Sequence, residues 1–102
     1  MRDIKCLTEF IAEELEDAEK YAKKALHYKD SNRKLAETYS LLAEEELRHS
    51  ELLHKEVVAM IEAHRATGKA APPEMMAIWE WEHGKAVDHK ARIKTMLQMY
   101  KT

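Results

Sequence analysis

The fold of this chain is decided by residues 3–28, which read DIKCLTEFIAEELEDAEKYAKKALHY. Steps of three and four residues join eight positions of this stretch, and this spacing places them along one side of an α-helix. Those positions are Ile4, Leu7, Ile11, Glu14, Ala18, Tyr21, Ala25 and Tyr28. Glu14 is their only charged member. The stretch therefore predicts a helix whose apolar seam is interrupted once, by a carboxylate.

A second stretch, residues 32–67, repeats the same steps of three and four. Its aligned positions are Leu35, Tyr39, Leu42, Glu46, His49, Leu53, Val57 and Met60. Apart from the Tyr39 hydroxyl, Glu46 and His49 are the only polar members. The sequence therefore predicts a second amphipathic helix, in which a carboxylate and an imidazole share one side because they are three residues apart.

Two turn signals separate the helical stretches. The first contains Asp30 and Ser31, either of which is suited to cap the second helix. The second contains Gly68, which can end a helix, and two adjacent prolines that interrupt one. We therefore expect one all-α domain, an antiparallel helical hairpin followed by a C-terminal helix with Gly84 as a candidate interruption. The expected ranges are 1–102 for the domain, 3–67 for the hairpin, 68–73 for the linker and 74–100 for the C-terminal helix.

The composition also favours a helical oligomer. The 102 residues are 45% apolar and 35% charged, and they include two glycines and two prolines, so disorder and sheet-rich folds are both disfavoured. A chain this short buries a limited fraction of its surface alone, so we expect at least a homodimer.

The net charge of -2 gives no electrostatic attraction toward nucleic acid or an anionic membrane. The chain has no run of ~20 apolar residues, and its single cysteine suits a reducing compartment. We therefore expect a cytoplasmic protein with neither nucleic acid nor membrane as a partner.

Folding the hairpin about Asp30 brings the polar positions of both stretches to the same height. Glu14 lies 16 residues before Asp30, and Glu46 lies 16 residues after it. Tyr21 and Tyr39, each nine residues from Asp30, form the neighbouring layer, about 10 Å farther along at a rise of ~1.5 Å per residue. The polar positions of two separate helices are thus expected to coincide in space.

Two glutamates in an apolar seam require compensation, because an isolated carboxylate loses its hydration there. Together with His49 they offer oxygen and nitrogen ligands, a mixture that suits a transition metal. Calcium and magnesium prefer all-oxygen shells, and a structural zinc site usually includes thiolates. The alternative is a pair of glutamates that share a proton beside a hydrogen-bonded core histidine. Because their heights coincide, we favour a metal site with Glu14, Glu46 and His49 as ligands.

Over residues 8–60, the sequence resembles the first helical hairpin of rubrerythrins and other ferritin-like di-iron proteins. The resemblance is carried by Glu14 with Tyr21 seven residues later, and by Glu46-Leu47-Arg48-His49. In this family each half of a four-helix bundle supplies a lone Glu and a Glu-x-x-His, and two halves enclose two irons. The chain carries one such half. The resemblance therefore implies a ferritin-like bundle completed by dimerisation, with two irons per subunit pair, Glu46 as the bridging ligand and Glu14 and His49 as terminal ligands.

The chain is also similar to encapsulated ferritins, in which two short chains pair to complete the iron site. The similarity lies in length and in the stretches Glu13–Glu16 and Glu45–His49, with Tyr21 between them. It suggests an encapsulin shell as a partner. However, residues 95–102 do not match the shell-targeting tail of that group, which argues against loading into a shell, and the C-terminal helical segment is longer than in that group.

Two further Glu-x-x-His pairs occur, and we do not expect either to bind metal. Glu51 and His54 are expected on the surface. The residue that would face them from the first helix is Glu9, which shares an edge of that helix with other charged residues. Glu80 and His83 are expected to make polar contacts at a subunit boundary, with metal ligation as the alternative.

The remaining chemistry-bearing residues are expected to serve packing or solvation. Tyr21 and Tyr39 are expected to pack, with a redox role as the alternative, and Cys6 is expected to be a packing residue. The histidines expected to be exposed are His27, His64 and His89.

Residues 85–102 carry five basic residues and one acidic, whereas residues 35–62 carry seven acidic and two basic. We expect these oppositely charged segments to meet between subunits.

Two functions fit this pattern. The first is a ferroxidase-type oxidoreductase, a homo-oligomer that oxidises Fe(II) with oxygen or peroxide at Glu14, Glu46 and His49. The second is a non-catalytic helical assembly or adaptor protein, in which the same site holds a structural metal or none. Near-stoichiometric iron with oxygen-dependent Fe(II) oxidation favours the first, and a folded metal-free oligomer favours the second.

Overall fold

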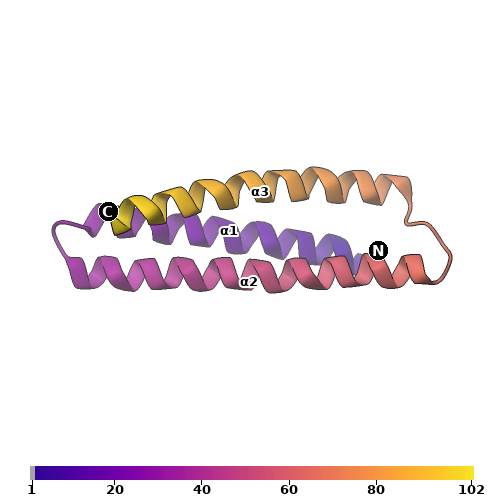
Figure 1. Cartoon of the computed structure of the whole chain (residues 1–102), viewed down its shortest axis with the longest axis horizontal. Coiled ribbons are helices and arrows are strands. Elements are labelled where there is room, and N and C mark those ends of the chain that lie inside the picture. Colours follow the sequence, from indigo (N-terminus) through magenta and orange to yellow (C-terminus); the bar gives the residue numbers. More distant parts are fainter. Residues whose placement is uncertain (1) are drawn as a thin grey trace.

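The computed structural model describes residues 2–102, which form three α-helices and no strand. The helices are α1 (Arg2–Tyr28), α2 (Arg33–Ala66) and α3 (Pro73–Lys101). The all-α prediction is therefore confirmed. The helices lie side by side along a rod that measures 57 × 19 × 17 Å (Figure 1).

The connection between α1 and α2 is short and tightly hydrogen-bonded, so the two helices run antiparallel (Figure 1). The Asn32 amide donates to the Tyr28 carbonyl at 2.9 Å, which closes the turn. Asn32 also caps α2, because its side-chain oxygen accepts from the Leu35 amide at 3.2 Å. The prediction of Asp30 or Ser31 as the cap was therefore wrong. Both residues belong to the turn that leads to Asn32, one or two positions too early to reach the first free amides of α2.

The connection between α2 and α3 follows the glycine and proline signals. Gly68 has a φ of 80°, a left-handed conformation that ends a helix and that glycine adopts without steric cost. Pro73 occupies the first position of α3, where its missing N–H costs no helical hydrogen bond. α3 then continues through Gly84 without the expected interruption. A single glycine lowers helix propensity by only about 1 kcal/mol, which the flanking helical residues offset.

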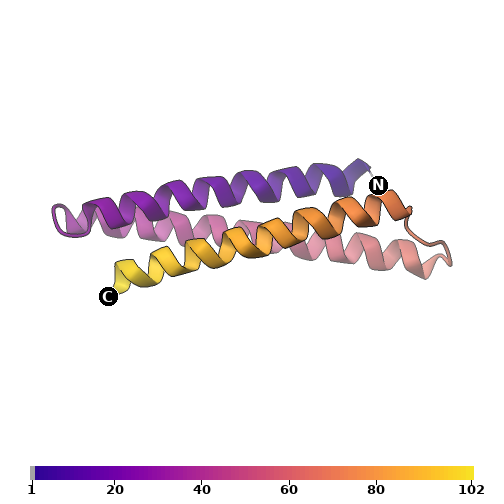
Figure 2. The ribbon, with the colours of Figure 1, turned by 90° about the horizontal axis from the view of Figure 1, so that it is seen from above.

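The apolar core lies between α1 and α2 and extends under the C-terminal half of α3. Small side chains such as Ala18, Ala22 and Ala43 are fully buried, which lets the helix axes approach closely. The largest fully buried side chains are Leu15, Val57 and Ile93. α3 packs mainly against α1 and touches α2 at few points. Figure 2 shows α3 crossing the hairpin obliquely, with its C-terminus near the α1–α2 turn.

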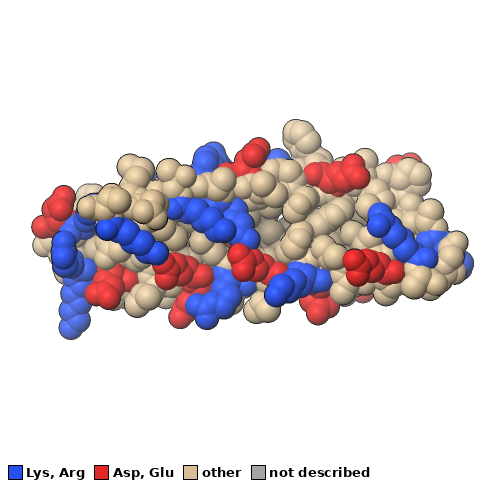
Figure 3. All heavy atoms as spheres, viewed as in Figure 1, with Lys and Arg blue, Asp and Glu red and all other residues tan. Residues whose placement is uncertain are grey.

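The basic end of α3 contacts the acidic face of α2 within the same chain. Lys90 Nζ lies 2.8 Å from a Glu51 carboxylate oxygen, and Lys101 Nζ lies 3.0 Å from one of Glu44. In Figure 3 acidic and basic side chains accordingly alternate along the visible side of the rod. The contact expected between subunits is thus made at these positions inside one subunit, because α3 folds back along the hairpin.

Three smaller expectations are corrected by the structure. Cys6 is exposed rather than packed, because it lies outside the α1 seam. His64 and His89 are half-buried rather than exposed, and only His27 is exposed as expected. His64 lies near the linker, where its Nε2 is 3.3 Å from the Ala70 carbonyl oxygen. Across residues 2–102, no helix has the length and apolar character needed to cross a membrane.

Candidate metal centre

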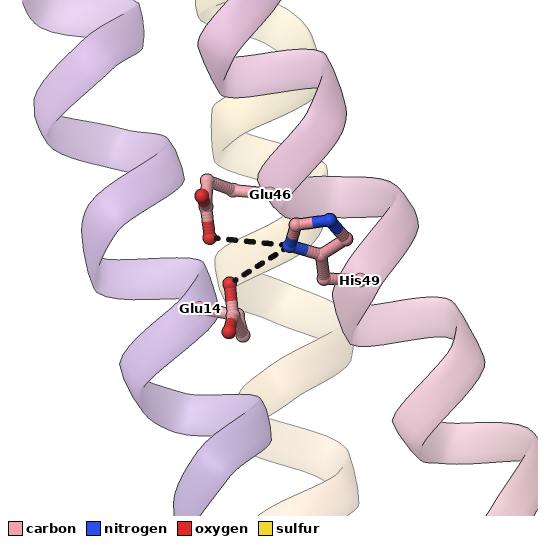
Figure 4. A group of neighbouring side chains, drawn as sticks. All are labelled: Glu14, Glu46 and His49. Atoms are coloured by element: carbon pink, nitrogen blue, oxygen red, sulfur yellow. Dashed lines mark ion pairs between the residues drawn. The ribbon is translucent and has the colours of Figure 1, made fainter.

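Three side chains meet on one face of the α1–α2 hairpin. Glu14 extends from α1, and Glu46 and His49 extend from neighbouring turns of α2 (Figure 4). One possible ligand atom from each lies within 4.8 Å of the other two. The His49 Nδ1 atom is 3.5 Å from Glu14 Oε2 and 3.8 Å from Glu46 Oε2. The structure therefore brings together the three residues that the sequence selected as ligands.

The hairpin geometry explains this convergence. Glu46 and His49 share a side of α2 because three residues advance a helix by nearly one turn. Glu14 reaches the same height because the turn at residues 29–32 is short enough to keep the two helices in the expected register. The fully buried Ala18 and Ala43 let α1 and α2 pack closely, which brings their side chains within reach of one another.

The centre is open to its surroundings. Its side chains range from mostly buried to exposed: 19% of the Glu46 side chain is accessible, 29% of Glu14 and 53% of His49. Figure 4 shows α3 behind the hairpin, on the other side from the three side chains. The carboxylates are therefore anchored in the hairpin, while the imidazole borders a face that α3 leaves uncovered.

The distances suit a metal ion. Ligand atoms that bind one metal at about 2.1 Å stand roughly 3–3.5 Å apart in tetrahedral or octahedral shells. The separations of 3.5 and 3.8 Å from His49 are already close to this range. The two carboxylates offer ligand atoms that lie within 4.8 Å of each other. Two carboxylates and one imidazole would also leave coordination positions on such an ion free for water or an oxidant.

No protein-family model, curated protein sequence or solved structure matches the chain. What distinguishes the candidate centre is the chemistry and spacing of its own side chains. Among residues 2–102, the group of three potential ligands that meets this distance criterion is Glu14, Glu46 and His49.

A layer of tyrosines lies next to the centre, toward the hairpin turn. The rings of Tyr21 and Tyr39 stack with centroids 6.2 Å apart, as their equal distances from the turn predicted. Tyr28 extends the stack, 6.1 Å from Tyr39 and nearly parallel to it. All three are half-buried, so this layer packs the two helices beside the carboxylates. A redox role for the tyrosines stays an untested alternative.

In the second Glu-x-x-His pair, the glutamate is exposed and the histidine is half-buried. Glu51 is exposed as expected, and a hydrogen bond from Lys90 together with its positive charge lowers the pKa of the Glu51 carboxyl. His54 is half-buried instead, because α3 folds back over this side of α2. Its ring lies 5.6 Å from the Trp79 indole and 4.9 Å from the His83 imidazole. The expectation of an exposed His54 was therefore wrong.

The third pair also makes its contacts inside the chain. The Glu80 side chain is exposed, whereas the His83 ring stacks on Trp79 at 5.2 Å and on His54. Stacked rings face each other with their π surfaces rather than directing nitrogen atoms at a common point. This arrangement provides packing between α2 and α3, and the subunit boundary expected for these residues is not needed to explain it.

One contact had no signal in the sequence. His89 of α3 places Nε2 3.2 Å from a Glu19 oxygen, but this buried nitrogen is not aligned for a hydrogen bond. Burial raises the pKa of Glu19, but the hydrogen bond and charge of Lys23, with the charges of His89 and Arg92, lower it more. The net pKa lies below its ordinary value of 4.5. Periodicity within each helix could not reveal this pairing, because it depends on where α3 docks.

Proposed function

We propose that this chain binds iron at Glu14, Glu46 and His49 and oxidises Fe(II) in a ferritin-like homo-oligomer. The observation that supports the proposal is the convergence of two carboxylates and one imidazole, from separate helices, within 4.8 Å. Fe(II) is the substrate of this reaction. Each Fe(II) gives one electron to oxygen or peroxide and becomes Fe(III).

The donor set fits this chemistry. Carboxylates are hard, anionic ligands, so Glu14 and Glu46 favour Fe(III) over Fe(II) and lower the barrier to electron loss. Glu46 is the least accessible of the three side chains, which suits a ligand held between two metals. His49 is the most accessible, which suits a ligand at the entrance.

A second copy of the chain would complete the site. One chain supplies three donors, which is half of the set that a ferritin-like bundle uses for two irons. Four apolar side chains one or two helical turns from the donors on α1 and α2 are incompletely buried. These are Leu7, Phe10, Leu42 and Leu53, and Phe10 is 46% accessible. Two hairpins that face each other would bury these side chains and bring the two donor sets together in a four-helix bundle.

A second candidate function has its own supporting observation. His49 lies within ion-pair distance of both carboxylates, so a protonated His49 would compensate Glu14 and Glu46 without a metal. In that case the centre would be a polar contact within a helical assembly or adaptor protein. The same experiments separate the two functions.

The test begins with metal-free protein titrated with Fe(II) under anaerobic conditions, followed by exposure to oxygen. We expect about one Fe(II) bound per chain, oxygen-dependent oxidation, and a light-scattering mass of at least twice 11.9 kDa. The matched control is Glu45→Ala, which removes an exposed carboxylate directly beside Glu46. A monomer, or a folded oligomer that neither binds nor oxidises Fe(II), would overturn the proposal and favour the adaptor.

A further inference from the structure

The two halves of α3 are held to the hairpin by different means. The C-terminal half buries Ile93 and Leu97, and Lys90 and Lys101 anchor it through ion pairs to α2. The N-terminal half, residues 73–83, contains no buried side chain. Its contacts with the core come from the half-buried side chains Met75, Met76 and Trp79. The N-terminal half is therefore the less tightly packed part of the helix.

Two hollows beside the middle of α3 reduce its packing against the hairpin further. A groove of about 600 Å³ lies between α1 and α3. Its apolar wall includes Ile11, Leu15, Trp79 and Ala86. A smaller hollow of about 100 Å³ lies between α3 and α2 and reaches the same Ile11 and Leu15. Close packing is thus missing on both sides of α3 at the point where its two halves meet.

A stack of three rings joins the N-terminal half to α2. His54 of α2 faces Trp79 and His83 of α3, with ring centroids 5.6 and 4.9 Å away. Trp79 and His83 stack on each other at 5.2 Å. The rings can stack in this way while both imidazoles are neutral. If both gain a proton, two positive charges face each other across half-buried rings.

The burial of His54 and the positive charges near it both disfavour its protonated form. Burial lowers the pKa of His54, and the positive charges of His83 and Lys90 lower it further. Glu51, which lies three residues before His54 on α2, is already bound by Lys90 at 2.8 Å.

The groove beside the stack is lined by five other charged side chains. They are Glu16 of α1 and Glu82, Lys85, Asp88 and Arg92 of α3. Lys85 holds Glu82 at 3.1 Å. No carboxylate among the described residues forms an ion pair with His54 or His83 at 4.0 Å or less.

We propose that residues 73–83 form a lid that opens from the hairpin when His54, stacked on His83, gains a proton. The lid pivots at Gly84, which lies between the two halves of α3 and has no side chain to hold it. Opening exposes the apolar wall of the groove at Ile11 and Leu15. The fold thereby contains an acid-operated lid over the apolar wall of this groove, on the other side of the hairpin from the candidate metal centre.

The lid opens at low pH because the closed lid favours the neutral form of His54. Its pKa in the closed lid lies below the ordinary value of 6.5, so the open lid binds more protons. The closed lid has its full stability above about pH 6.5 and loses it as the pH falls below that value.

Amide hydrogen exchange tests the lid directly. After correction for the intrinsic pH dependence of exchange, we expect the opening of residues 73–83 to increase below pH 6.5 by up to about tenfold per pH unit for each proton taken up. Residues 88–101 should show no such increase. Equal acid-induced opening of both halves, or no pH-dependent opening of either, would overturn the proposal.

Ring-preserving variants identify the groups that gain the protons. His54→Phe/His83→Phe keeps the aromatic stack without ionisable rings, so acid-induced opening should be lost. His27→Phe is the control, because His27 is exposed near the other end of α1. If the double variant opens with acid as the wild type does, the proposal fails.

A second measurement keeps both histidines, so it does not depend on whether the double variant folds. Trp81→Phe removes an exposed indole and leaves Trp79 as the sole tryptophan. Its emission should shift to longer wavelength below pH 6.5 as the lid opens, and an unshifted emission down to pH 5 would overturn the proposal.

Discussion

The two sides of the hairpin both contain histidine, but the neighbours of that histidine differ. On the open side His49 faces two carboxylates, so positive charge from a proton or a metal is attracted there. On the side covered by α3, His54 faces another histidine, so added positive charge is repelled. The same side chain therefore has neighbours that attract positive charge on one face and neighbours that repel it on the other. The neighbours of each histidine differ because α1 packs beside His49, whereas α3 packs beside His54.

The largest expected effect is loss of the cation site on the open face. Glu46→Ala or His49→Ala should weaken metal binding by well over tenfold, since even changes behind the ligands typically cost 10–100-fold. In a two-fold symmetric site each substitution removes two ligands. Calorimetric titration with Fe(II) under anaerobic conditions measures the loss. Glu51→Ala should bind normally, and an equal loss there would mean that the wrong face had been assigned.

The next effect contrasts the two halves of α3. Ile93→Ala removes a fully buried side chain from the C-terminal half and should destabilise the fold by about 2–5 kcal/mol. Met75→Ala, in the half-buried N-terminal half, should cost less, because less apolar surface leaves water there. Denaturant unfolding of both variants gives the comparison. Equal losses would show that the two halves of α3 are held alike.

A leucine at the carboxylate layer separates function from stability. Glu14→Leu should abolish iron oxidation yet leave the metal-free oligomer as stable as wild type or more stable, because replacing buried charge with apolar contact is often neutral or favourable. Thermal unfolding with chelator present provides the measurement. A marked fall in the unfolding temperature would indicate that the carboxylates hold the assembly together through their own hydrogen bonds.

The smallest effect belongs to an ion pair on the α3 side. Lys90→Met should destabilise the protein by about 0.2–1 kcal/mol at pH 7 and low salt, because the Glu51 partner is half exposed and screened by solvent. Lys90 lowers the pKa of Glu51 below its ordinary value of 4.5, so this stabilisation is present above pH 4.5 and disappears as the pH falls below it. Unfolding at several pH values measures it. High salt should shrink the difference, and a difference that persists at pH 3 would contradict an ionic origin.

The sequence predicted the hairpin and the position of its polar cluster because both depend on local rules. Helical periodicity placed Glu14, Glu46 and His49 on facing seams, and a short turn fixed their relative height. The same arithmetic predicted that Tyr21 and Tyr39 share a layer, and in the structure their rings stack there. These features need only the spacing within each helix and one tight connection.

Only the tertiary structure decided how α3 lies on the hairpin. Its apolar residues are distributed around the helix rather than along one stripe, so periodicity alone does not select the face that packs. The docked position of α3 is held by the buried side chains Ile93 and Leu97 and by the ion pairs to α2. That position buries His54 beside His83 and places His89 beside Glu19. Such contacts depend on how two helices align when no short turn fixes their relative height. The sequence alone therefore determined the face with Glu14, Glu46 and His49, whereas the contacts under α3 were determined by the tertiary structure.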